Sequence, residues 1–243
     1  LVGSEMCIRD RAKTLGFQIK TCLDKASFFE AVKETGPELL IIDTHGGVDE
    51  TTHNSFIMMG NDIVTGDDVV NSGIGPQLVF LSACNTFTTY NTINTIANAF
   101  FQIGANAVTT SYMPLHVLPA TVLYIRLLRN LNEAAHKNIH LNWLSFISHL
   151  MRTSYIHAPI GKKENLNLKK ETLDTLSELT VQSMFFDKRR EVYEKLNDKK
   201  FTKNLNCNYE YVIPHYLMYS TLGRADLIFF QSSLDDIMPE FLQ

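Results

Sequence analysis

The stretch Leu39-Leu40-Ile41-Ile42-Asp43-Thr44-His45-Gly46 is an aliphatic run that ends in polar residues and glycine. A second stretch, Leu78-Val79-Phe80-Leu81-Ser82-Ala83-Cys84-Asn85, has the same form. Such runs are typical of strands that are buried on both faces of a parallel sheet. In open α/β sheets, catalytic groups lie just beyond the carboxyl ends of the strands. If the two strands are neighbours, about 5 Å apart, His45 and Cys84 face each other across one edge.

The segments around these two runs alternate between strand and helix patterns. Ser27 is expected to cap a helix, with Glu30 in the capping box and Gly36 at its end. This order predicts a three-layer α/β/α sandwich around a mostly parallel sheet. The other expected elements are a strand at 17–23, a hairpin at 56–64, a short helix at 65–71, a helix at 94–101 and a strand at 107–111.

The second half of the chain carries helical spacing and then a charged region. Residues 117–157 have apolar side chains at intervals of three and four, so we predict helix throughout. Residues 161–206 are rich in lysine and glutamate and indicate a charged helical insertion, with a helix over 171–196. Residues 217–222 are expected to form a helix that Gly223 ends, and 227–230 a last strand.

Residues 1–11 are treated separately from the rest. They resemble a translated sequencing-adapter read-through, so we regard them as non-native and exclude them from the fold. The pattern that follows begins within a helix of the kind that normally follows a first central strand. We therefore expect one domain over residues 12–243, with a sheet that lacks its first strand.

Composition limits the classes of function. The 243 residues are 45% hydrophobic and 20% charged, which is ordinary for a globular domain. A net charge of −4 and a pI near 6.1 give no electrostatic reason to expect a nucleic acid or an anionic membrane as partner. Four irregularly spaced cysteines predict neither a disulfide framework nor a zinc site, and favour a reducing, cytoplasmic setting.

His45 and Cys84 are the residues with the strongest chemical interest. A neighbouring imidazole can take the proton of a thiol and so produce the thiolate nucleophile. Gly46 lets the backbone approach a substrate carbonyl, and its N–H with that of Cys84 would form an oxyanion hole. The alternative is a purely structural role, with Cys84 as an inert buried cysteine and His45 as a histidine in a turn. Their joint position at two strand ends favours catalysis.

The segment from Leu39 to Pro114 resembles the CHAT domains, which are caspase-like cysteine peptidases related to caspases and separases. The resemblance rests on the stretches at 43–46, 60–69, 81–86, 99–105 and 108–112. It implies a His/Cys peptidase without metal or other cofactor, whose substrate is a protein or peptide. It also implies an upstream regulatory region, commonly of helical repeats, that activates the domain.

The resemblance implies further roles close to the two reactive residues. The residue two positions before the cysteine lines the substrate pocket in several relatives, and here it is Ser82. Because Ser82 is small and neutral, we expect no strong preference for arginine or lysine before the cleaved bond. Apart from the resemblance, Asp43 is expected to orient His45 or bind nearby backbone, and Asn85 and Thr86 are expected to cap or brace the turn after Cys84.

Three functions other than a cysteine peptidase are conceivable for this sequence. A metal site made from Asp43, His45, Asp49 and His53 has suitable ligand types, but no known ligand spacing. A nucleotide-binding domain would need a glycine-rich phosphate loop after a strand, which the sequence lacks. A caspase-like scaffold without catalysis, acting as a protein-interaction module, remains the main alternative to a peptidase.

Overall fold

The computed structural model describes residues 16–88, 94–115, 117–136, 139–154 and 215–230, together with isolated positions between 171 and 200. The prediction for residues 1–11 lies outside the described residues, as does nearly all of the charged insertion at 161–206 with its predicted helix over 171–196. Within the described part, no helix combines the length and the hydropathy needed to cross a membrane.

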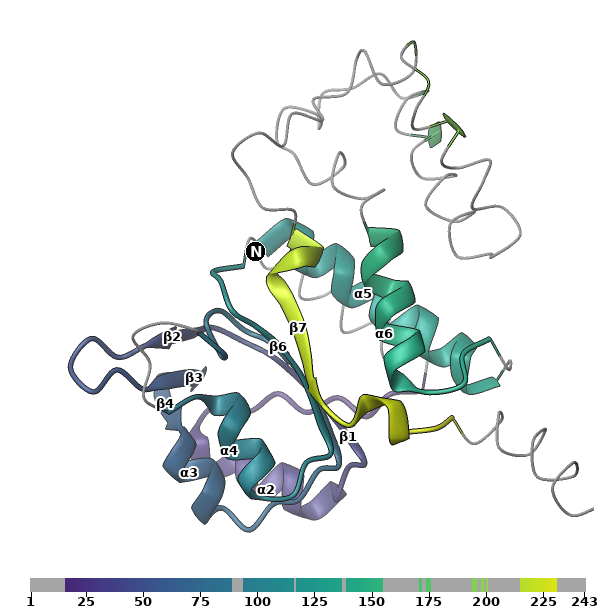
Figure 1. Ribbon diagram of the computed structural model, residues 1–243. Coiled ribbons are helices and arrows are strands. Elements are labelled where there is room, and N and C mark those ends of the chain that lie inside the picture. Colours follow the sequence, from purple (N-terminus) through teal and green to yellow (C-terminus); the bar gives the residue numbers. More distant parts are fainter. Residues whose placement is uncertain are drawn as a thin grey trace, which may run out of the picture.

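A four-stranded sheet forms the centre of the molecule (Figure 1). Its order is β1 (Leu39–Asp43), β5 (Leu78–Ser82), β6 (Ala107–Ser111) and β7 (Tyr219–Gly223). The first three strands are parallel, and β7 is antiparallel to β6. Every residue of β5 is buried, as expected of a strand covered on both faces. The mostly parallel sheet is therefore confirmed.

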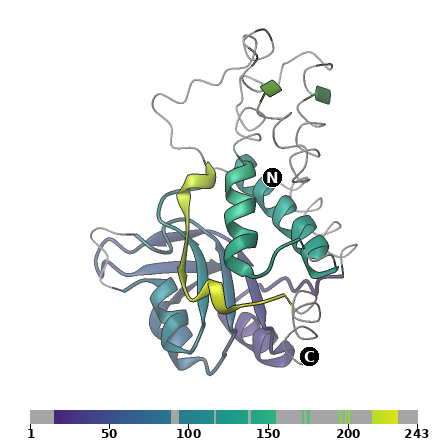
Figure 2. The ribbon, with the colours of Figure 1, turned by 45° about the vertical axis from the view of Figure 1, so that its right-hand side comes forward.

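Helices cover both faces of this sheet (Figures 1 and 2). Val79 and Leu81 of β5 pack in one core with α2 (Lys25–Thr35), α3 (Gly66–Asn71) and α4 (Ile96–Gln102). Leu78 and Phe80 point to the opposite face and pack in a second core with α5 (Val117–His136) and α6 (Trp143–Thr153). This alternation within one strand produces the predicted three-layer sandwich.

A small antiparallel sheet follows β1 directly. It contains β2 (Gly46–Val48), β3 (Ser55–Met59) and β4 (Asp62–Thr65), in that order. The predicted hairpin is thus confirmed as β3 and β4, joined at Gly60 with φ of 61°. The short helix after it is also confirmed, with Thr65 as its N-cap.

Helix boundaries differ from the sequence prediction in two places. Asp24, rather than Ser27, caps α2, and Ser27 instead completes the capping box from the third helical position. The Asp24 carboxylate accepts the Ser27 N–H at 2.7 Å, and this hydrogen bond lowers the pKa of Asp24. The continuous helix over 117–157 is wrong, because α5 ends at His136 and Asn142 caps the start of α6.

Two strand predictions and one helix prediction are also wrong. Residues 17–22 form no ladder with another strand, so the expected strand at 17–23 is absent. Residues 219–223 form β7 instead of a helix, since they pair with β6 along its whole length. Residues 227–230 contain the end of a 3₁₀ turn (Ala225–Leu227) and one isolated bridge between Phe229 and Asn142, rather than a strand.

Arg126 is a buried cation that joins α5 to α6. Its side chain is 4% exposed and donates to the hydroxyls of Thr153 and Ser154 at 2.7 and 2.5 Å, and to the Leu150 carbonyl at 3.3 Å. No ion pair compensates its charge among the described residues, and its Nε lacks a partner there. Burial lowers the pKa of Arg126 to about 10.

We predict that Arg126→Met leaves the melting temperature unchanged or raises it. Methionine fills the same space without a buried charge, and such replacements are often neutral or stabilising. Both hydroxyls keep a hydrogen bond without Arg126, because that of Thr153 donates to the His149 carbonyl and that of Ser154 donates to the Leu150 carbonyl. Arg126→Ala, the matched control, leaves a cavity and is expected to cost about 2–4 kcal/mol. Thermal unfolding followed by circular dichroism compares them; equal losses in both variants would contradict the argument.

Candidate active site

The carboxyl ends of β1 and β5 bring His45 and Cys84 to one edge of the sheet. The two strands pair in register up to Asp43 and Ser82. The ladder continues one residue further, where the Thr44 N–H donates to the Ser82 carbonyl at 3.2 Å. His45 and Cys84 each lie two residues beyond the last register pair, so they leave adjacent strands at the same level.

The surroundings of Gly46 show that the segment after β1 lies directly against the segment after β5; these two segments are called the two loops below. A Cβ atom built on Gly46 would lie 2.5 Å from the Cys84 carbonyl oxygen and 3.2 Å from both the Cys84 nitrogen and the Ala83 Cβ. Only glycine fits at this distance, because a real Cβ essentially never approaches a backbone atom so closely. The residue after His45 therefore packs on the main chain of Cys84.

The small antiparallel sheet fixes the backbone around His45. The His45 carbonyl accepts the Met58 N–H at 2.9 Å, and the Thr44 hydroxyl donates to the Met58 carbonyl at 2.5 Å. Hydrogen-bonded and non-bonded pairs alternate in an antiparallel ladder. Gly46, opposite Ile57, therefore belongs to a non-bonded pair, and its N–H points away from β3. The imidazole of His45 is exposed to solvent.

Cys84 has a hydrogen-bond donor that sequence analysis did not find. Its side chain is half-buried, and the Leu115 N–H donates to Sγ at 3.1 Å. The Leu115 carbonyl lies 3.9 Å from the same sulfur, within reach of a thiol proton. This contact fixes the position of the sulfur beside the segment that follows β6. No side-chain signal could have revealed this contact, since the donor is main chain after β6.

Buried hydroxyls hold the turn that carries Cys84. Asn85 has a φ of 54°, so the chain reverses sharply just after the cysteine. Thr86 is fully buried, and its hydroxyl pairs with that of Thr110 at 2.7 Å and reaches the Ala83 carbonyl at 3.3 Å. The Ser111 hydroxyl also donates to the Ala83 carbonyl. Both Asn85 and Thr86 lie in this turn, and Thr86 ties it to β6.

Asp43 and Ser82 lie beside a buried tyrosine. Tyr219 of β7 is 8% exposed and stacks on Phe80 with ring centroids 5.7 Å apart. Burial raises the pKa of Tyr219; the nearby Ser82 hydroxyl opposes the rise, whereas the charge of Asp43 adds to it. Ser82 is buried and Asp43 exposed, so the two differ in their access to a substrate.

The residues considered above as metal ligands do not lie close together in the structure. Asp49 uses its carboxylate within its own loop, where it accepts the Thr52 N–H at 2.6 Å and the Thr51 N–H at 3.0 Å. These contacts lower the pKa of Asp49. Across the described part of the chain, no three His, Cys, Asp or Glu side chains lie close enough to hold a metal ion. The set Asp43, His45, Asp49 and His53 is therefore not a ligand cluster.

The chain is similar to a known protein family. The family model described as the CHAT domain matches residues 11–141, which is more than half of the chain. A search of the curated proteins found no match. The matched region contains α2, the strands β1 to β6 of the two sheets, and both reactive residues.

We predict that Gly46→Ala destabilises the protein by about 1–3 kcal/mol, as overpacking typically does. The new methyl group must push against the Cys84 main chain, which the buried hydroxyls hold in place. Gly75→Ala is the matched control, because a Cβ there meets no atom within 4 Å. Urea unfolding midpoints measure the difference; a Gly46→Ala midpoint equal to that of Gly75→Ala would show that the two loops are not in firm contact.

Proposed function

This chain belongs to the CHAT domain family, which is part of the caspase-like peptidase clan, and we propose that it is a cysteine endopeptidase. Cys84 is the nucleophile, and His45 is the general base and acid. The observation that carries the proposal is the in-register pairing of β1 and β5, with both residues following it at the same level. The packing of Gly46 on the Cys84 main chain supports the same pairing.

The proposed reaction has two steps. In the first, the Cys84 proton passes to His45, the sulfur attacks the peptide carbonyl, and His45 returns the proton to the leaving amine. In the second, His45 takes a proton from water, the hydroxide attacks the thioester, the C–S bond breaks to release the acid product, and His45 returns the proton to the Cys84 sulfur. The N–H groups of Gly46 and Cys84 are the proposed donors to the carbonyl oxygen as it gains charge. The Leu115 N–H holds the sulfur in position through its hydrogen bond.

The substrate and setting follow from this chemistry. We propose a protein substrate that presents an extended segment across the exposed His45, with Ser82 and Asp43 nearest the residue before the cut. A reducing compartment such as the cytoplasm would keep the thiol free; Cys22 and Cys84 are both free here. Regulation by a further region or partner is part of the proposal.

One observation favours the alternative, a scaffold without catalysis. The Cys84 sulfur is half-buried and lies between the N–H and the carbonyl of Leu115, so an idle thiol would also be satisfied there. Reactivity separates the two functions, because only a peptidase needs His45 to activate the sulfur.

We predict that Cys84 reacts rapidly with a peptidyl chloromethyl ketone and that His45→Ala slows this reaction about 10²- to 10⁴-fold, the usual contribution of a general base. Cys22 is the internal reference. Burial, and then the charge of Asp24, raises the pKa of the Cys22 thiol, so its labelling should be slow and indifferent to His45. Peptide mass spectrometry after digestion separates the sites. Equal labelling of Cys84 with and without His45 would favour the scaffold.

A further inference from the structure

The peptide bond between Ala83 and Cys84 carries one of the two N–H groups assigned above as donors to the substrate carbonyl oxygen. Among the described residues, this N–H has no acceptor. Main-chain N–H groups in the packed parts of a protein nearly always have a partner, so one without an acceptor beside a candidate nucleophile is available to a ligand. The direction of this N–H then decides whether it can act on the substrate oxygen.

The carbonyl of the same peptide group accepts hydrogen bonds from two buried hydroxyls. Ser111, the last residue of β6, is fully buried, and its hydroxyl donates to the Ala83 carbonyl. The Thr86 hydroxyl is also fully buried and reaches the same oxygen at 3.3 Å. Thr86 in turn binds the Thr110 hydroxyl at 2.7 Å, so these hydroxyls form one buried network around the carbonyl.

Ser111 takes over where the main-chain ladder stops. The pairing of β5 with β6 ends at Phe80 and Thr109. Ala83 lies beyond that point, and its carbonyl is bound by a side chain of β6 instead of a main-chain N–H. The Ser111 hydroxyl has no other acceptor in the part of the chain that the structure describes. Its single proton is therefore committed to the Ala83 carbonyl.

The peptide bond transmits this constraint to the N–H of Cys84. The bond is trans, so its carbonyl and its N–H point in opposite directions. β5 lies between β1 and β6 in the sheet. Because the carbonyl is directed at Ser111 of β6, the Cys84 N–H is directed to the β1 side. Gly46 lies there, and a Cβ built on it would be 3.2 Å from the Cys84 nitrogen.

We propose that Ser111 is a positioning residue of the peptidase site. Its hydroxyl, together with that of Thr86, holds the Ala83 carbonyl so that the Cys84 N–H faces the carbonyl oxygen of the substrate. This role rests on the proposed peptidase function, and it adds residues that do not touch the substrate. Hydrogen bonds to a carbonyl also polarise its peptide group, which makes the N–H a stronger donor as the substrate oxygen gains charge.

Two reagents for the same sulfur separate the position of the N–H from the position of the thiol. With p-nitrophenyl acetate, the Cys84 sulfur forms a bond to the carbonyl carbon, the oxygen gains charge, p-nitrophenolate leaves, and His45 takes the thiol proton. With iodoacetamide, the sulfur displaces iodide from a saturated carbon, and no oxyanion forms. The rate of Cys84 acetylation divided by that of alkylation, followed in the full chain by peptide mass spectrometry, therefore reports on the oxyanion donors.

We expect Ser111→Ala to lower this ratio roughly tenfold, a part of the about 10²- to 10³-fold that the loss of an oxyanion donor costs. The alkylation rate should stay the same, because the sulfur and His45 keep their positions. Ser111→Thr keeps the hydroxyl and should restore most of the ratio. Thr109→Val is the matched control and should leave the ratio unchanged, since the Thr109 hydroxyl is fully buried on the same strand but binds Thr221 at 3.0 Å.

An unchanged ratio in Ser111→Ala, or an equal fall in Thr109→Val, would overturn the proposal. So would an equal loss of both rates in Ser111→Ala, because the hydroxyl would then hold the whole turn and not the N–H alone. If Ser111→Ala fails to fold, Thr86→Val gives the same comparison, and a fall in the ratio is again expected. Failure of the peptidase function has a different signature: acetylation of Cys84 in the unmodified protein would not depend on His45, and the role of Ser111 would be rejected with it.

Discussion

The parallel pairing of β1 with β5 is the interaction on which the rest of the structure depends. Because β5 is buried throughout, it divides its side chains between two cores, and each core collects the helices of one layer. The same pairing sets the level at which both chains leave the sheet. A shift in register by one residue would separate His45 from Cys84 and would also move Ser82 away from Asp43.

Main-chain contacts, more than side-chain contacts, position the candidate site. Gly46 packs on Cys84, Met58 holds the His45 carbonyl, and the Leu115 N–H reaches the sulfur. The buried hydroxyls add to this by binding the Ala83 carbonyl rather than the reactive groups. Such a site keeps its geometry through the sheet, so the imidazole can stay exposed to a substrate while its backbone is fixed.

The sequence predicts well what depends on local pattern and less well what depends on a distant partner. The aliphatic runs of β1 and β5, the hairpin at 56–64 and the short helix after it all carry local signals, and the structure has them as expected. β7 was missed because Tyr219–Gly223 becomes a strand only through pairing with β6. For residues 17–23 the error is the reverse. The sequence has a strand pattern, but the segment pairs with no neighbouring strand among the described residues. The Leu115 donor has no side-chain signature at all.

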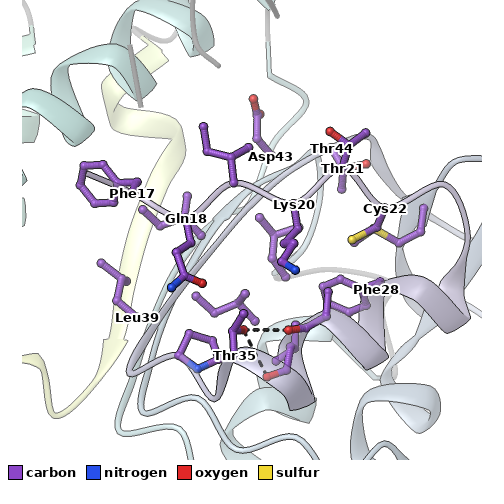
Figure 3. A pocket seen from close by; sticks show the side chains of 18 of the residues that line it. Phe17, Gln18, Lys20, Thr21, Cys22, Phe28, Thr35, Leu39, Asp43 and Thr44 are labelled. Carbon is purple, nitrogen blue, oxygen red and sulfur yellow. Dashed lines mark hydrogen bonds between the residues drawn. The ribbon is translucent and has the colours of Figure 1, made fainter. Parts of the chain in front are cut away.

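β1 leads directly into the part of the candidate site that carries the imidazole. Its outer edge faces a cavity of about 730 Å³ (Figure 3), and its carboxyl end continues through Asp43 and Thr44 into His45. Both Asp43 and Thr44 line the cavity, and Thr44 also joins the ladder to Ser82 and the hydroxyl contact to Met58. Thr44 therefore ties the large sheet to the small one directly before His45, so the backbone that carries the imidazole is held from both sides.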